Sequence, residues 1–143
     1  MAWLLDTNIL SELRRLKPEP KVLAFIAAQP LNQLYISAVT FAELRFGIQL
    51  LSEGSIRRDE LDNWLAYKIR SMFGERVLQV TEDIIFRWRI IVEEGRKVGH
   101  TYSQPDLMIA ATALHHRLTV VTRDSRDFVK AGVLIANPWE ALS

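Results

Sequence analysis

Short apolar runs alternate with longer segments of helical periodicity along nearly the whole chain. The apolar runs have the length of β-strands and are bounded by polar residues. They lie at 3–5, 34–37, 76–80, 118–122 and 133–136. The helical segments lie at 9–14, 20–28, 39–51, 57–73, 82–98 and 105–117. Strands that alternate with helices indicate βαβ units, so we predict an α/β fold with a mostly parallel sheet and helices on both faces.

The helical segment at 82–98 is apolar nearly all round, and the segment at 57–73 is also unusually apolar for a surface helix. A helix of this kind is buried on more than one side. Either the segment at 82–98 lies deep in the core or a second subunit covers it. We favour a homodimer, because 143 residues leave few other elements to cover it.

No internal repeat, low-complexity tract or linker divides the sequence, so we expect a single domain over residues 1–143. The N-terminus lacks the pattern of a signal peptide, and no run approaches the roughly 20 apolar residues of a membrane helix. The chain has no cysteine, which excludes disulfides, thiolate nucleophiles and Cys-ligated zinc. These features are typical of a reducing compartment, so we expect a cytoplasmic protein without membrane contact.

The net charge is only +1, which predicts no strong overall attraction to nucleic acid. The basic residues are mostly arginine, which binds phosphate and carboxylate groups bidentately. This bias weakly favours a phosphate-bearing substrate or an acidic partner, although salt bridges on helix surfaces are the simpler explanation.

Four acidic residues stand out by their positions relative to the predicted elements, and a fifth lies close to the last of them. Asp6 follows the first strand, and Glu43 lies early in the helix after the second. Asp106 opens the helix before the fourth strand, Asp124 follows that strand, and Asp127 comes three residues later. Parallel strands end at the same edge of a sheet, so we expect Asp6 and Asp124 to lie together there.

Helix capping is a simpler explanation for each acid taken singly, and a cap contributes about 1 kcal/mol. Residues 40–43 match a capping box, and residues 103–106 and 124–127 resemble one. Glu43, however, shares a helix row with Val39, Phe46 and Leu50. We therefore expect its carboxylate in an inward-facing apolar stripe, where it needs a partner.

Convergence of these acids requires a compensating charge. Two carboxylates about 4 Å apart repel by about 4 kcal/mol at an effective dielectric constant of about 20. Three or four together are tolerable only with protons or a cation between them. Oxygen ligands suit Mg²⁺ or Mn²⁺, which points to metal-assisted hydrolysis of a phosphodiester.

At these residues the chain resembles the PIN-domain nucleases, and more closely the VapC and FitB toxins of prokaryotic toxin–antitoxin pairs. Four motifs carry the resemblance in order, and it covers nearly the whole chain. They are LDTNILSE at 5–12, SAVTFAEL at 37–44, DLMIAATA at 106–113, and LTVVTRD at 118–124 with Asp127 and Phe128. The ending Asn137-Pro138-Trp139 is similar to the FitB branch.

The resemblance implies a PIN-like α/β/α sandwich with a central five-stranded sheet, and RNA as the substrate. It implies a catalytic site of Asp6, Glu43, Asp106 and Asp124, in which Asp6, Asp106 and Asp124 bind Mg²⁺ or Mn²⁺. Whether Asp124 or Asp127 completes that site stays open.

The motifs also imply supporting residues around the carboxylates. Thr7 and Asn8 match the polar residues beside the first acid, and Thr122 matches a hydroxyl position in the fourth motif. Glu12 matches the opening motif as a supporting residue or a structural salt bridge. Arg14, Arg15, Lys17, Arg45 and Arg123 lie near the ends of the motifs and are candidates for contacts with an RNA backbone, with solvated charge as the simpler explanation.

Partners follow from the same resemblance. A small antitoxin is expected to wrap the protein and block the site, with an arginine aimed at the acids. A homodimer is expected, and a larger toxin–antitoxin assembly on DNA is a further expectation.

Two other functions are weighed against the ribonuclease. One is a non-catalytic nucleic-acid-binding regulator that acts with its antitoxin, although pure binding to a polyanion would not gather four acids. The other is aspartyl phosphotransfer with Asp6 as the nucleophile. Enzymes of that kind usually carry a second Asp two residues later, where this chain has Asn8.

Overall fold

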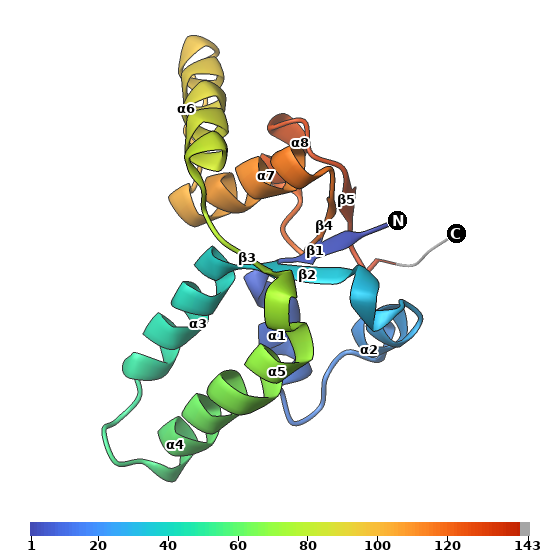
Figure 1. The fold of residues 1–143 in the computed structure, drawn as a ribbon, viewed down its shortest axis with the longest axis vertical. Helices are drawn as coiled ribbons and strands as arrows, with labels where there is room; N and C mark the ends of the chain where they lie inside the picture. Colours follow the sequence, from blue (N-terminus) through green and yellow to red (C-terminus); the bar gives the residue numbers. More distant parts are fainter. Residues whose placement is uncertain (141–143) are drawn as a thin grey trace.

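The computed structural model describes residues 1–140, and it contains one sheet of five strands in the order β3-β2-β1-β4-β5 (Figure 1). All of its strand pairs are parallel. The strands are β1 (Trp3–Leu5), β2 (Leu34–Ser37), β3 (Val77–Leu78), β4 (Thr119–Val121) and β5 (Ile135–Ala136). The predicted α/β class and the five-stranded parallel sheet are confirmed.

Helices cover both faces of this sheet, as Figure 1 shows. The first group lies below the sheet in that view: α1 (Thr7–Leu13), α2 (Pro20–Ala27), α3 (Ala38–Gln49), α4 (Ile56–Asn63) and α5 (Arg70–Phe73). The second group lies above it: α6 (Glu82–Lys97), α7 (Gln104–His116) and α8 (Arg126–Lys130). The arrangement is the predicted α/β/α sandwich.

Strand alternation divides the core between the two faces. Leu5 and Val121 belong to the apolar cluster under α1, α2 and α3, whereas Leu4 and Val120 belong to the cluster under α7 and α8. All four side chains are at most 1% exposed. Successive residues of a strand point to opposite faces, so β1 and β4 are buried from both sides.

The register of β1 against β4 sets the edge on which the site is built. Leu5 lies opposite Val121, so both strands end at the same level. The backbone N–H of Asp6 then donates to the carbonyl of Val121 at 3.0 Å. The residues that follow the two strands are therefore brought side by side.

The predicted helix at 57–73 runs as α4, a π-helical segment at Trp64–Ile69, and α5. The strands predicted at 76–80, 118–122 and 133–136 pair over fewer residues than expected. Helix α8 was not predicted, because its five residues are too short to show a helical period.

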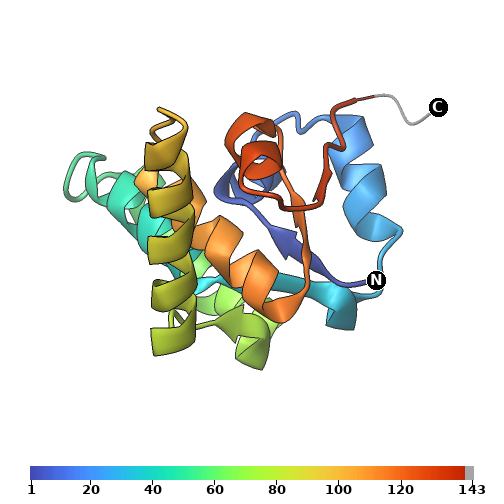
Figure 2. The same cartoon turned by 90° about the horizontal axis from the view of Figure 1, so that it is seen from above.

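Helix α6 does not lie deep in the core, so that alternative for the segment at 82–98 is wrong. Ile84 and Ile91 are buried against α7, but Phe86 is 66% exposed and Ile90 is 43% exposed. Figure 2 shows α6 on the outside of the molecule, beside α7. An apolar face of α6 is therefore uncovered in the single chain. Within residues 1–140, no helix combines the length and apolar character that crossing a membrane requires.

Gly95 lets the end of α6 lie directly against the segment that leads into α7. A β-carbon at this position would lie 2.6 Å from Cε2 of Tyr102 and 2.9 Å from the backbone oxygen of His100. We expect Gly95→Ala to lower the free energy of unfolding by about 1–3 kcal/mol, because the backbone of the segment must shift. Chemical denaturation measures the change.

Gly47→Ala is the matched control, since Gly47 lies in α3 with nothing within 4 Å of the added carbon. There we expect a gain of up to about 1 kcal/mol from helix propensity. Equal effects of the two substitutions would contradict the close approach at Gly95.

Candidate active site

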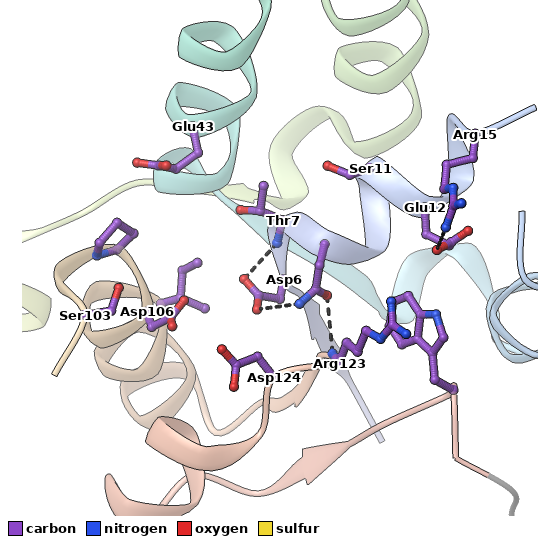
Figure 3. A pocket seen from close by; sticks show the side chains of 14 residues that line it. Asp6, Thr7, Ser11, Glu12, Arg15, Glu43, Ser103, Asp106, Arg123 and Asp124 are labelled. Atoms are coloured by element: carbon purple, nitrogen blue, oxygen red, sulfur yellow. Dashed lines mark hydrogen bonds and ion pairs between the residues drawn. The ribbon is translucent and has the colours of Figure 1, made fainter.

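A cleft of about 580 Å³ opens at the carboxyl edge of the sheet. Asp6, Glu43, Asp106 and Asp124 all line it, and they come from four separate parts of the chain (Figure 3). Asp6 follows β1, Glu43 lies on α3, Asp106 lies in the first turn of α7, and Asp124 follows β4. The cleft thus gathers the four acids that the sequence singled out.

Asp6 is held in one orientation by residues that follow β1 and β4. Its Oδ1 accepts the backbone N–H of Thr7 at 2.8 Å, which caps α1, and its Oδ2 accepts the Thr122 hydroxyl at 2.8 Å. Asn8 Nδ2 adds a longer hydrogen bond to Oδ2 at 3.5 Å. The side chain is only 4% exposed. This one carboxylate therefore both caps α1 and lines the cleft.

Asn8 and Thr122 connect the first motif to the last. Asn8 Nδ2 donates to the Thr122 hydroxyl at 3.2 Å, and Asn8 Oδ1 accepts the backbone N–H of Arg123 at 3.4 Å. The Thr122 oxygen also accepts the backbone N–H of Asp124 at 3.1 Å. The segment that carries Asp124 is thereby fixed to the start of α1.

The carboxylates perturb one another. Burial raises the pKa of Asp106 to about 6, and the negative charges of Asp6, Asp124, Asp127 and Glu43 contribute to that rise. Burial also raises the pKa of Asp6, although its hydrogen bonds to Thr122 and Thr7 oppose the rise. Negative charge is therefore concentrated at the cleft, where a cation would lower the energy.

Three expectations from capping are wrong. The hydroxyl of Ser37 caps α3 by accepting the backbone N–H of Val39 at 3.0 Å, so Thr40 and Glu43 do not form a capping box. The capping boxes expected at 103–106 and 124–127 are not formed either. The N-cap residues of α7 and α8 are Ser103 and Ser125, and neither makes a side-chain capping bond.

The inward-facing stripe expected for Glu43 is also wrong. Glu43 is exposed, and its row neighbours Phe46 and Leu50 are 64% and 71% exposed. The position of α3 beside α1 accounts better for its place on the cleft. The Thr7 and Thr40 hydroxyls lie 3.4 Å apart at this contact.

Asp127 lies outside the lining of the cleft, whereas Asp124 lies on it. One oxygen of Asp127 lies 3.2 Å from Nε2 of His100, and the other accepts the backbone N–H of Ser103 at 3.4 Å. Asp127 therefore holds the segment before α7. His100 and Ser103 were missed, because their contacts with α8 depend on chain reversal after Gly99.

Glu12 also uses both of its oxygens within the protein. It pairs with Arg15 Nη1 at 3.3 Å and accepts the backbone N–H of Glu19 at 3.1 Å. It is 4% exposed and fixes the end of α1 to the start of α2. Trp139 lines the cleft beneath Arg123, whose Cζ lies 5.2 Å from the ring centroid.

The donor set fits a hard divalent cation. Asp6, Asp106 and Asp124 offer carboxylate oxygens, which suit Mg²⁺ or Mn²⁺. Within residues 1–140, no three acidic or imidazole side chains already form a closed ligand set. The fit therefore rests on the chemistry of the donors and on their mutual repulsion.

We expect Asp124→Asn to lower the pKa of Asp106 in the metal-free protein, because one of the negative charges that raise it is removed. Carbon-detected NMR titration of the Asp106 carboxyl measures the change. Asp62→Asn, at an exposed position on α4, is the matched control and should leave the Asp106 pKa unchanged.

The same pKa shift predicts a pH dependence of stability. Folded Asp106 holds its proton up to about pH 6, whereas the unfolded group releases it near pH 4. Its contribution is complete below the unfolded pKa and is lost as the pH rises through about 6. Asp106→Asn should abolish this part of the decline; an identical decline in both proteins would contradict the assignment.

Comparison with known proteins agrees with this geometry. The family model described as PIN domain matches residues 3–134. The VapC ribonuclease Y4jK from Sinorhizobium fredii is 40% identical over 95% of this chain and 96% of that protein. Toxin FitB from Neisseria gonorrhoeae is 38% identical over 95% of this chain and 97% of that protein. A chain from the structure of FitAB bound to an IR36 DNA fragment has a TM-score of 0.91 and 35% identity, covering 99% of this chain and 98% of that chain.

Proposed function

The chain belongs to the PIN-domain family, and from this we propose that it is a divalent-metal-dependent endoribonuclease, acting as the toxin of a toxin–antitoxin pair. The observation that carries the proposal is the meeting of four carboxylates from four motifs at one cleft. A ribonuclease and a toxin, each about 40% identical over nearly the full length, support the same function. The chain is proposed to act as one domain.

In this proposal Asp6, Asp106 and Asp124 hold Mg²⁺ or Mn²⁺. Such an ion, when bound, polarises the phosphodiester and neutralises the negative charge that develops during hydrolysis. Thr7, Asn8 and Thr122 keep Asp6 in place, which reduces the cost of ordering the site.

Glu43 and Asp127 have different roles in the proposal. Glu43 lies on the cleft and is exposed to water, so it can accept a proton from an attacking water molecule. Asp127 keeps the segment before α7 in place through His100 and Ser103, and thereby supports the position of Asp106.

The proposed protein partner is a small antitoxin that occludes the cleft, with an assembly of both proteins on DNA. The similarity to toxin FitB and to a chain of the DNA-bound FitAB complex supports this partner. A second copy of the chain is proposed to cover the apolar face of α6, where Phe86 and Ile90 are exposed.

We expect Asp6→Asn and Asp106→Asn each to reduce RNA cleavage by roughly a hundredfold or more, because a charge that stabilises the transition state is lost. Gel analysis of purified protein with total RNA and Mg²⁺ or Mn²⁺ measures the rate, and a chelator should abolish it. Asp62→Asn is the matched control and should cleave at the wild-type rate.

Circular dichroism and Mn²⁺ binding separate loss of chemistry from loss of fold. The variants should stay folded and bind Mn²⁺ more weakly than the wild-type chain. Metal-dependent cleavage retained by the pure Asp6→Asn/Asp106→Asn double variant would refute the proposal.

We expect Phe86→Asp to convert the dimer to a monomer, because it places a charge in the proposed apolar contact of α6. Light scattering after size-exclusion chromatography measures the mass. Leu16→Asp is the matched control, since Leu16 is 98% exposed in the segment between α1 and α2. A monomeric wild-type chain, or a dimer unaffected by Phe86→Asp, would count against this surface.

A further inference from the structure

A second and smaller cavity, of about 130 Å³, adjoins the acidic cleft. Ser11 and Arg15 line both cavities, so the two lie side by side. Arg14, Arg57 and Trp64 form much of the remaining wall of the smaller one, which we name the arginine pocket. We propose that the arginine pocket binds a backbone phosphate of the RNA strand beside the phosphodiester that is cut. This inference rests on the proposed ribonuclease function.

The guanidinium of Arg14 is already held in position. Arg14 is the C-cap residue of α1, and its Cζ lies 4.6 Å from the centroid of the Trp64 ring. This cation–π contact restrains the guanidinium without using its N–H donors. An anion therefore meets an ordered donor, which lowers the entropic cost of binding.

Two of the three arginines of the pocket make no ion pair among the described residues. Among residues 1–140, neither Arg14 nor Arg57 has a carboxylate within ion-pair distance, whereas Arg15 pairs with Glu12. Burial lowers the pKa of Arg14, and the positive charge of Arg57 lowers it further, against the weaker effect of Glu60. Arginine stays protonated under such shifts, so an anion between the two would relieve their repulsion.

The position of the pocket favours RNA over an acidic protein segment. The acidic cleft repels a polyanion, so the phosphates next to the cut bond need cations close by. Arg15 spans the boundary between cleft and pocket, and Arg123 lines the cleft itself. With a net charge of +1, the chain must supply this attraction locally. The cavity of about 130 Å³ has room for one phosphate group.

Arg57→Gln tests the proposal with little risk to the fold, because Arg57 is exposed in the first turn of α4. Arg87→Gln is the matched control: it removes the same charge from an exposed position on α6, away from both cavities. The affinity of the full chain for a labelled short single-stranded RNA is measured at several salt concentrations, in an Asp106→Asn background that prevents cleavage.

We expect Arg57→Gln to raise the Kd for RNA several-fold and to reduce the slope of log K against log salt by about 0.7, the value for one lost phosphate contact on a single strand. In the cleaving protein, KM should rise by the same factor while kcat changes little. Arg87→Gln should leave the Kd, the slope and KM unchanged.

Unchanged RNA affinity and salt slope in Arg57→Gln would overturn the arginine pocket while leaving the ribonuclease intact. Weaker binding of the antitoxin with unchanged RNA affinity would assign the pocket to the protein partner and overturn the proposal. A wild-type chain that cleaves no RNA in Mg²⁺ or Mn²⁺ would overturn both the proposed function and this inference, so the two failures are distinguishable.

Discussion

The hydrogen bond between the Thr122 hydroxyl and Asp6 joins residues 116 positions apart in the sequence, at the edge where β1 and β4 end together. The cleft depends on this contact. Burial removes the carboxylate of Asp6 from water. The hydrogen bond that the Thr122 hydroxyl donates offsets part of this desolvation cost. The same hydroxyl accepts the backbone N–H of Asp124, so one side chain orders two acids.

The carboxylates held at this edge of the sheet repel one another. The sheet and helices bring Asp106 toward Asp6 and Asp124. Among residues 1–140, none of these three carboxylates forms an ion pair with a lysine or an arginine. A site of this kind costs stability when empty, and that cost becomes binding energy for a cation. Hydrogen bonds to Asp6 keep it ready for that role, whereas Asp106 is more easily protonated.

The parts of this structure that follow local chemistry could be predicted from the sequence. The runs at 3–5 and 34–37 have the bounds of β1 and β2, and the parallel order of the strands placed Asp6 and Asp124 at one edge. The four acids on the cleft follow from that order together with the motifs. Helix periodicity also gave α6 and α7 to within one residue at each end.

What failed depends on tertiary packing. The periodicity around Glu43 identified a helix row correctly, but not which way α3 presents that row, and Phe46 and Leu50 are exposed. The apolar content of α6 indicated burial without showing that one chain leaves Phe86 uncovered. Asp127 could not be separated from Asp124, because its partner His100 lies 27 residues away in the sequence.

The close contact at Gly95 links α6 to the segment that leads into α7 and the cleft. With no gap between α6 and the backbone at His100, a sideways displacement of α6 has to move the loop as well. That loop is tethered to Asp127 through His100 and Ser103, three residues before Asp106. A second subunit bound to α6 would thus be able to shift the first turn of α7, which carries Asp106. Dimer formation and the activity of the cleft would then be coupled.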